Sequence, residues 1–308
     1  MAAASAIAEV PERLESVFLN TDTQLNDKGI YAVNLYALGV PHTVVVDDYL
    51  PVGNHGLVMA DKGDDGSLWS PILEKAFSKY WGNYTRTEGG WPEMAIRTLT
   101  GSPYIEMNSS RISADALWDI LLESDGKDDI ITATTPGGGN HDLTHENGLA
   151  HSHAYTVVGV VTLETGARLV KMRNPWGIER YTGPYCDNCS EWTDATAEAV
   201  DLVRNTYDGY FFIDIENFHG SFDWTMVSWD TEGWFHDAFV MLDDDLSTAS
   251  SNTRCQGNCS AHDLVIESEV AQKIYVMMHT WDRRSAPRSC FAGSGYNYWD
   301  SDVLGRGT

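Results

Sequence analysis

The amino-acid sequence predicts an α+β fold, with helix-rich segments early in the chain and β-rich segments later. Apolar residues recur every three or four positions in residues 2–18 and 68–82, which is typical of amphipathic helices. From Ala154 onwards, short runs of β-branched and aromatic residues alternate with turn residues, which is typical of strands. The length of 308 residues is enough for about two domains with a buried core.

The first predicted elements are a helix and a pair of strands. Residues 2–18 are rich in Ala and carry apolar side chains at helical spacing, so we expect one helix there. Residues 29–38 and 42–50 are two β-rich runs, and only the turn-forming segment 39–41 separates them. This arrangement predicts an antiparallel pair.

Three more helices follow in the first half of the chain. Residues 68–82 are strongly amphipathic, and a shorter helix is predicted at 92–101. The adjacent glycines in residues 87–91 interrupt the apolar pattern between these helices, so we interpret that segment as a hinge between two lobes. Ser113 is the expected N-cap of the helix over 113–123.

The β-rich part begins with a strand at 130–136. The segment 154–177 then predicts a hairpin, because two apolar β runs flank a turn at 163–166. An acidic helix is predicted at 193–205, and a strand with a following helical turn at 209–218.

Composition changes again near residue 225. From there to residue 308 the chain consists of short β runs separated by Ser, Asn, Gly and Asp. We expect these residues to form a β-sandwich-like domain that is incomplete in this chain.

The charge balance excludes several classes of partner. The chain holds 45 acidic against 20 basic residues, a formal charge of −25, and no cluster of Lys or Arg. Such a chain repels phosphate backbones and anionic lipid headgroups, so we expect neither nucleic acid nor a membrane surface as a partner. The acidic excess is interpreted mainly as a contribution to solubility.

The remaining composition points to a folded protein of the cytoplasm. Apolar residues make up 43% of the chain, which is too much for intrinsic disorder. The chain has five cysteines, which are too few for a disulfide scaffold and cannot all pair within the chain because their number is odd. A reducing compartment fits them best. The N-terminus lacks the pattern of a signal peptide, and no apolar run reaches the length of a membrane span.

Two polar residues meet at the open end of the predicted hairpin. A two-residue turn at Glu164 and Thr165 pairs Asn174 with Tyr155, which makes His153 its diagonal neighbour at about 7–8 Å. An Asn carbonyl that accepts the imidazole N–H fixes the tautomer of the ring and turns its other nitrogen towards a nucleophile. The alternative is that the two residues only cap the hairpin.

Trp176 lies two residues beyond Asn174. From that position its indole can shield the hydrogen bond between His153 and Asn174 from water.

The motifs around this pair resemble those of a known family. The runs HAYTVVG (153–159), RNPWG (173–177) and DGYFFIDIENF (208–218) are similar to the second lobe of the calpain-type cysteine protease core, and the similarity covers residues 2–225. The resemblance implies a papain-like fold of two lobes that cleaves peptide bonds in protein substrates. It assigns His153 as general base and then acid, and Asn174 as the residue that orients it.

The chain departs from the family at the nucleophile. Calpain-like proteases take it from a Gly-x-Cys-Trp segment at the start of a helix, and this sequence contains no such segment. The resemblance places that cysteine about three residues before Met1, so we expect Met1 to be an internal residue of a longer reading frame. As written, the chain is expected to be inactive, and the alternative is a non-catalytic regulatory or peptide-binding module.

Other cysteines and histidines raise alternative interpretations. Cys186 and Cys189, together with Cys255 and Cys259, have the number of thiols that a zinc site needs, although they fall on different predicted domains. Four histidines form a dense group in and after a glycine-rich loop, at positions 141, 145, 151 and 153. We favour a loop beside the active site over a metal centre for this group.

Calcium is implied by the resemblance alone. The family binds the ion after RNPWG and around the later Asp-Gly, where Asp187 and Asp208 retain carboxylates. Arg180 and Tyr210 stand where the family usually has Glu, and a guanidinium reverses the local charge. We therefore expect a weakened site, and no cofactor is required for the chemistry.

These observations divide the chain into three parts. Residues 1–88 are predicted as the remainder of a helical first lobe and residues 89–225 as a β-rich second lobe with His153 and Asn174. Residues 226–308 are predicted as the incomplete sandwich.

Overall fold

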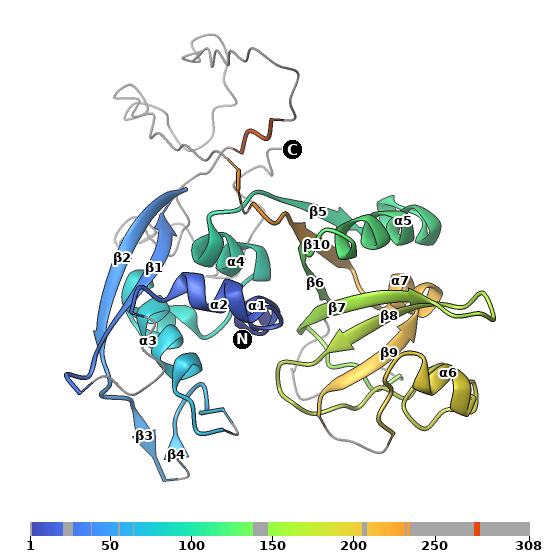
Figure 1. Ribbon diagram of the computed structural model, residues 1–308, viewed down its shortest axis with the longest axis horizontal. Coiled ribbons are helices and arrows are strands. Elements are labelled where there is room, and N and C mark those ends of the chain that lie inside the picture. Colours follow the sequence, from blue (N-terminus) through green and yellow to red (C-terminus); the bar gives the residue numbers. More distant parts are fainter. Residues whose placement is uncertain are drawn as a thin grey trace, which may run out of the picture.

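The computed structural model combines helices and strands, with one large sheet beside a group of N-terminal elements (Figure 1). It describes residues 2–20, 27–37, 39–54, 56–63, 65–137, 147–204, 208–231, 233–234 and 274–277. The β runs expected after residue 234 lie outside these ranges, apart from residues 274–277.

The first predicted helix is in fact two helices, α1 (Ala2–Ala8) and α2 (Pro11–Val17). The prediction of one continuous helix was wrong because of Pro11. A proline disfavours helical backbone in the residue before it, and Val10 has the extended angles φ −119° and ψ 105°. The break turns the chain between the two helices and leaves Glu9 at the junction.

The N-terminal elements pack around one apolar cluster, which we call the N-terminal cluster. Strands β1 (Ile30–Ala37) and β2 (Val40–Asp47) form the predicted antiparallel pair. The predicted helices are confirmed as α3 (Trp69–Trp81) and α4 (Pro92–Thr100). The buried members of the cluster include Ile7, Leu35, Ile72, Ile96 and Met226.

The large sheet has six strands in the order β5-β10-β6-β7-β8-β9, and all neighbouring strands are antiparallel. Its strands are β5 (Tyr104–Asn108), β6 (Ile130–Thr134), β7 (Ala154–Thr162), β8 (Arg168–Arg173), β9 (Tyr210–Asp214) and β10 (Trp224–Ser228). Two short strands, β3 (Val52–Gly53) and β4 (Gly56–Leu57), pair with each other elsewhere. The 3-10 turns are η1 (Tyr84–Thr87) and η2 (Ser109–Arg111).

The hairpin of β7 and β8 reaches the predicted register at its open end by a different route. Its loop has three residues, Glu164 to Gly166, because Leu163 N–H donates to Ala167 O over 2.8 Å. Such a loop shifts the pairing by one residue relative to a two-residue turn. A bulge between Val157 and Gly159 reverses the shift, so that Thr156 pairs with Arg173.

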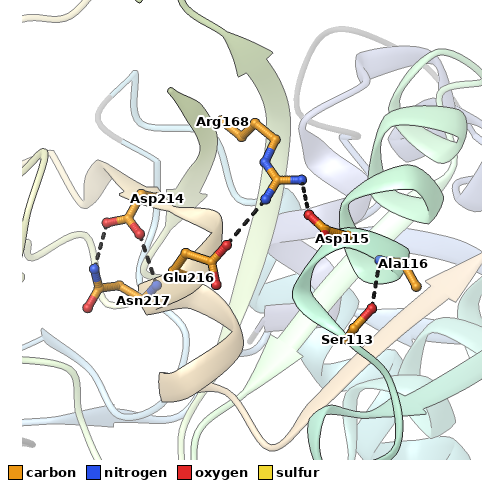
Figure 2. Close-up of polar contacts among 7 residues, drawn as sticks. All are labelled: Ser113, Asp115, Ala116, Arg168, Asp214, Glu216 and Asn217. Carbon is orange, nitrogen blue, oxygen red and sulfur yellow. Dashed lines mark hydrogen bonds and ion pairs between the residues drawn. The ribbon is translucent and has the colours of Figure 1, made fainter. Parts of the chain in front are cut away.

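Helices α5 (Ala114–Asp125) and α7 (Ile215–Ser221) pack against each other beside the sheet and bury its main apolar cluster. Ser113 caps α5 as predicted, since its Oγ accepts from Ala116 N over 3.2 Å. Figure 2 shows Arg168 of β8 between the two helices, where it pairs with Asp115 and Glu216.

The predicted acidic helix is much shorter than expected. Helix α6 covers only Asp194–Glu198, with Thr193 as its N-cap. The chain leaves the helical path shortly afterwards, and Asp201 has a left-handed φ of 52°. Leu202 N donates to Ala197 O over 2.9 Å, so the chain folds back on the end of the helix through Asp201, a residue type that adopts the left-handed conformation more readily than most.

The strand β10 crosses residue 225, where the sequence divides the chain. It lies between β5 and β6 in the large sheet, so residues 226–228 belong to that sheet. Helix α4, after the expected hinge, packs on α1 and β1. The division into domains remains a prediction. Within the described ranges, none of the helices is both long and apolar enough to cross a bilayer.

Candidate active site

The structure brings His153 and Asn174 into direct contact. His153 Nε2 lies 2.9 Å from Asn174 Oδ1, at the open end of the hairpin where the sequence places the pair. Asn174 is only 4% exposed, and two backbone groups fix its amide. Its Nδ2 donates to Ile178 O over 2.8 Å, and its Oδ1 also accepts from Trp176 N over 3.1 Å.

This arrangement fixes the tautomer of the imidazole. Because Ile178 O can only accept, the Asn174 amide must present its oxygen to His153. The proton of neutral His153 therefore resides on Nε2, and Nδ1 is the basic nitrogen. A ring held in this way can take a proton at Nδ1 while keeping its bond to Asn174.

Two aromatic rings flank the imidazole. The Trp176 ring centroid lies 3.9 Å from that of His153, and Tyr155 approaches edge-on at 4.8 Å. Trp176 is 44% exposed, so its outer face meets solvent while its inner face covers the imidazole. This is the position expected of a side chain that shields the bond to Asn174.

Thr135 anchors the backbone of His153. Its Oγ1 accepts from His153 N over 3.0 Å and donates to Ala150 O over 2.7 Å, while its own N–H donates to His153 O over 2.9 Å. Thr135 is 5% exposed, directly after β6. Its role was not predicted from the sequence, where a threonine after a β run carries no distinguishing signal.

A close backbone approach supports Asn174 from the other side. Asn174 N donates to Gly209 O over 2.8 Å. A Cβ at Gly209 would lie 2.9 Å from Asn174 O and 3.0 Å from Gly177 Cα, and its φ is +84°. Only glycine meets both conditions without displacing the segment that holds Asn174.

Helix α1 begins beside the strand that directly follows His153. Thr156 Oγ1 of β7 donates to Ala2 O over 3.3 Å, and α1 packs on both β6 and β7. The N-terminal end of α1 therefore contacts a residue that is three positions after His153 in the sequence.

Asp187 faces Glu179, a residue that the sequence analysis passed over. Asp187 is 4% exposed and shares a hydrogen bond with Glu179. Burial, the hydrogen bond to Asp187 and the charges of Asp187 and Asp208 raise the pKa of Glu179 to about 9, so at neutral pH Glu179 keeps its proton and donates a hydrogen bond to Asp187. Burial likewise raises the pKa of Asp187. The sequence contains a signal for this contact, since Glu179 is a carboxylate directly before Arg180, where the family usually has Glu.

Tyr210 joins a different group of charges. Its hydroxyl lies 3.4 Å from Glu9 Oε2, and Glu9 pairs with Arg173 Nη1 over 2.7 Å. The guanidinium of Arg173 lies 5.1 Å from the Tyr210 ring centroid. Burial and the Glu9 carboxylate raise the pKa of Tyr210. This cluster ties the α1–α2 junction to the residue that directly precedes Asn174.

The described residues do not support the metal interpretations. Cys186 and Cys189 form a disulfide with each other, so in this state neither offers the thiolate that zinc binds. Cys255, Cys259, His141 and His145 lie outside the described ranges. Inside those ranges, no three His, Cys, Asp or Glu side chains gather closely enough to hold a metal ion.

Comparison with known proteins shows the family to which the chain is similar. Residues 1–228 match the family model described as calpain family cysteine protease. The matched segment contains every element from α1 to the end of β10, and with it both His153 and Asn174.

Individual relatives agree. The chain is 32% identical over 224 residues to the calpain-type cysteine protease DEK1 of Zea mays, covering 70% of this chain and 10% of that protein. It is 30% identical over 236 residues to human Calpain-12, covering 74% of this chain and 32% of the relative. With human Calpain-14 the identity is 32% over 228 residues, covering 72% and 33%. The chain thus spans a tenth to a third of these relatives.

Proposed function

The chain belongs to the calpain family of cysteine proteases, and from this premise we propose that it is the greater part of the catalytic core of an endopeptidase acting on proteins in the cytoplasm. The observation that carries the proposal is the bond of 2.9 Å between His153 Nε2 and Asn174 Oδ1. A pair that only capped a hairpin would not need the ring fixed in one tautomer with its basic nitrogen turned away from the amide.

In the proposed reaction His153 first removes the proton of a cysteine thiol through Nδ1. The thiolate attacks the carbonyl carbon of a peptide bond, and the imidazolium then protonates the leaving amine, which leaves a thioester. His153 next removes a proton from water, and the resulting hydroxide attacks the thioester carbonyl. The C–S bond breaks, the carboxylic acid product leaves, and the cysteine thiolate takes the proton back from His153. Asn174 holds the ring through both proton transfers, and Trp176 keeps water from their bond.

We propose that the thiol is supplied by residues preceding Met1 in the natural protein. Three observations support this position. The motif resemblance places the nucleophile on the helix that continues as α1. Ala2 of α1 contacts Thr156 of β7, and His153 directly precedes that strand. The N-terminal elements and the large sheet would then be two papain-like lobes with the site between them.

The residues present do not fit the calcium site that the family implies. Tyr210 engages Glu9 and offers no carboxylate, and Arg180, which stands where the family usually has Glu, is exposed and carries the opposite charge. We propose that this site is weakened and that catalysis does not require it. Calorimetric titration of calcium into the chain is expected to give little heat, and tight binding would contradict this part of the proposal.

The proposal is tested by labelling the product of the natural transcript with a thiol-directed epoxide. The expected result is modification of one cysteine upstream of Met1, and labelling about 100-fold slower or more in His153→Ala. His42→Ala, which removes an exposed histidine of β2, is the matched control and should label at the wild-type rate.

Equal labelling of wild type and His153→Ala would contradict the assigned role. A transcript without an upstream cysteine would favour the alternative of a regulatory or peptide-binding module, which binds unfolded polypeptides without cleaving them.

A further inference from the structure

The loop between β8 and α6 contains a disulfide with no assigned role. Cys186 and Cys189 are bonded to each other across three positions, and Cys189 N also donates to Cys186 O over 2.9 Å. Both cysteines are half-buried, and they lie next to the exposed residues Pro184 and Asn188. The disulfide therefore lies at the edge of the main apolar cluster, against which Cys186 packs, and not fully inside it.

Such a disulfide contributes little to holding the fold together. A cross-link stabilises a protein mainly by restricting the unfolded chain, and the effect decreases as the enclosed loop becomes shorter. The ring here encloses only Asp187 and Asn188. The segment remains anchored without it, because Trp192 Nε1 donates to Tyr185 O over 3.1 Å and to Cys186 O over 3.0 Å.

Asp187, which the disulfide ring encloses, is linked to the active site by a short series of contacts. Asp187 is 4% exposed and accepts a hydrogen bond from Glu179. Glu179 directly follows Ile178, whose carbonyl accepts from Asn174 Nδ2 over 2.8 Å. Asn174 in turn holds His153. The Cys186–Cys189 turn is therefore connected, through Asp187 and Glu179, to the carbonyl that orients the Asn174 amide.

We propose that Cys186 and Cys189 are a reversible redox site for small thiols and disulfides such as glutathione, and that the disulfide form holds Asp187 against Glu179 and so supports Asn174. The effect on Asn174 rests on the proposed function, whereas the exchange chemistry does not.

The exchange is balanced in two steps. One cysteine thiolate attacks glutathione disulfide, forms a mixed disulfide and releases one glutathione thiolate. The second cysteine thiolate attacks the protein sulfur of the mixed disulfide and releases the other. Two cysteine thiols are thereby oxidised by two electrons, glutathione disulfide is reduced to two glutathione molecules, and the protons pass to the released thiolates.

The first arm of the test measures the redox state of the pair. The 308-residue chain is equilibrated in glutathione buffers of increasing reducing strength, alkylated and digested with trypsin. The peptide 181–204 contains Cys186 and Cys189 and no other cysteine, so its mass reports this pair alone. It should change from no alkyl groups to two across buffers of physiological poise. A peptide that keeps no alkyl groups, or always carries two, would overturn the redox site.

The second arm measures the effect on the active site by the NMR signals of the His153 ring. Reduction should shift these signals in the wild type and in Glu179→Gln, whose amide still donates to Asp187, but not in Glu179→Ala. Identical His153 signals in the two redox forms, or an equal response in Glu179→Ala, would overturn the coupling and leave the first arm intact. Failure of the proposed function would appear instead as epoxide labelling that does not depend on His153.

Discussion

At the scale of single residues, the site depends on hydrogen-bonding capacity. The side chain of Asn174 has one oxygen and one NH₂ group. Its NH₂ group donates to Ile178 O and its oxygen accepts from Trp176 N–H, so only one orientation of the amide satisfies both. The tautomer of His153 thus follows from two backbone groups that are four and two residues from Asn174. Thr135 holds the backbone of His153 in a similar way, through its hydroxyl and its backbone amide.

The raised pKa of Glu179 predicts how the stability of the fold depends on pH. Its pKa is about 9 in the folded chain and near 4.5 when unfolded, so the folded state holds one more proton between these values. Its contribution to stability is therefore complete below about pH 4.5 and is lost as the pH rises towards 9.

Glu179→Gln cannot lose that proton, so it should gain stability relative to the wild type as the pH rises from 5 to 9. The gain should be about 1 kcal/mol, since solvent screens this half-exposed group. Chemical unfolding at both pH values measures it. An equal difference at pH 5 and pH 9 would show that Glu179 ionises normally in the folded chain.

At the scale of elements, the hairpin of β7 and β8 explains how the sequence predicted the contact between His153 and Asn174 although the predicted turn was wrong. The expected two-residue turn and the observed three-residue loop differ by one residue, and the bulge before Gly159 removes that difference. Alternating apolar residues fix which face of a strand is buried, and thus the register at the open end. They do not reveal the loop length, because a bulge compensates for it.

Two glycines with the same backbone conformation test the role of the Gly209 contact. Gly209 and Gly166 have φ of +84° and +86°, but nothing lies within 4 Å of a Cβ at Gly166, whereas a Cβ at Gly209 meets Asn174 O. Gly166→Ala should cost about 1 kcal/mol for the left-handed conformation alone. Gly209→Ala should cost about 2–3 kcal/mol and also shift the His153 ring signals. Denaturant unfolding and NMR measure both, and equal costs would refute the contact.

At the scale of the whole molecule, the N-terminal elements and the large sheet are joined by polar as well as apolar contacts. Ile130 and Met226 of the sheet belong to the N-terminal cluster, and Glu9 at the α1–α2 junction pairs with Arg173. The position of Glu9 depends on the break before Pro11. This break was not predicted, because the apolar periodicity of residues 2–18 continues across the proline.

The ion pair between Glu9 and Arg173 should contribute measurably, since both side chains are largely buried. A double-mutant cycle with Glu9→Gln and Arg173→Met is expected to give a coupling energy of roughly 1 kcal/mol. A coupling energy of zero would mean that this ion pair does not help to join the two parts. The pair Lys127 and Glu123, which is exposed on one helix end, provides a control with a smaller expected coupling.

The sequence predicted what depends on local patterns and missed what depends on the path of loops. The order of helices and strands, the Ser113 cap and the meeting of His153 with Asn174 follow from periodicity and turn chemistry. The contacts of Glu179 with Asp187 and of Tyr210 with Glu9 were not predicted, because these partners meet only through tertiary structure. Residues 235–273 and 278–308 lie outside the description, so the expected sandwich stays a prediction.

The central claim is that Asn174 holds His153 as a base with its proton on Nε2. Long-range proton–nitrogen NMR correlation of the His153 ring in the 308-residue chain tests it directly. Neutral His153 is expected to carry its proton on Nε2 in the wild type and to lose this preference in Asn174→Ala, while the signals of exposed His42 stay unchanged. A proton on Nδ1, or a His153 spectrum that is the same in both chains, would contradict this claim.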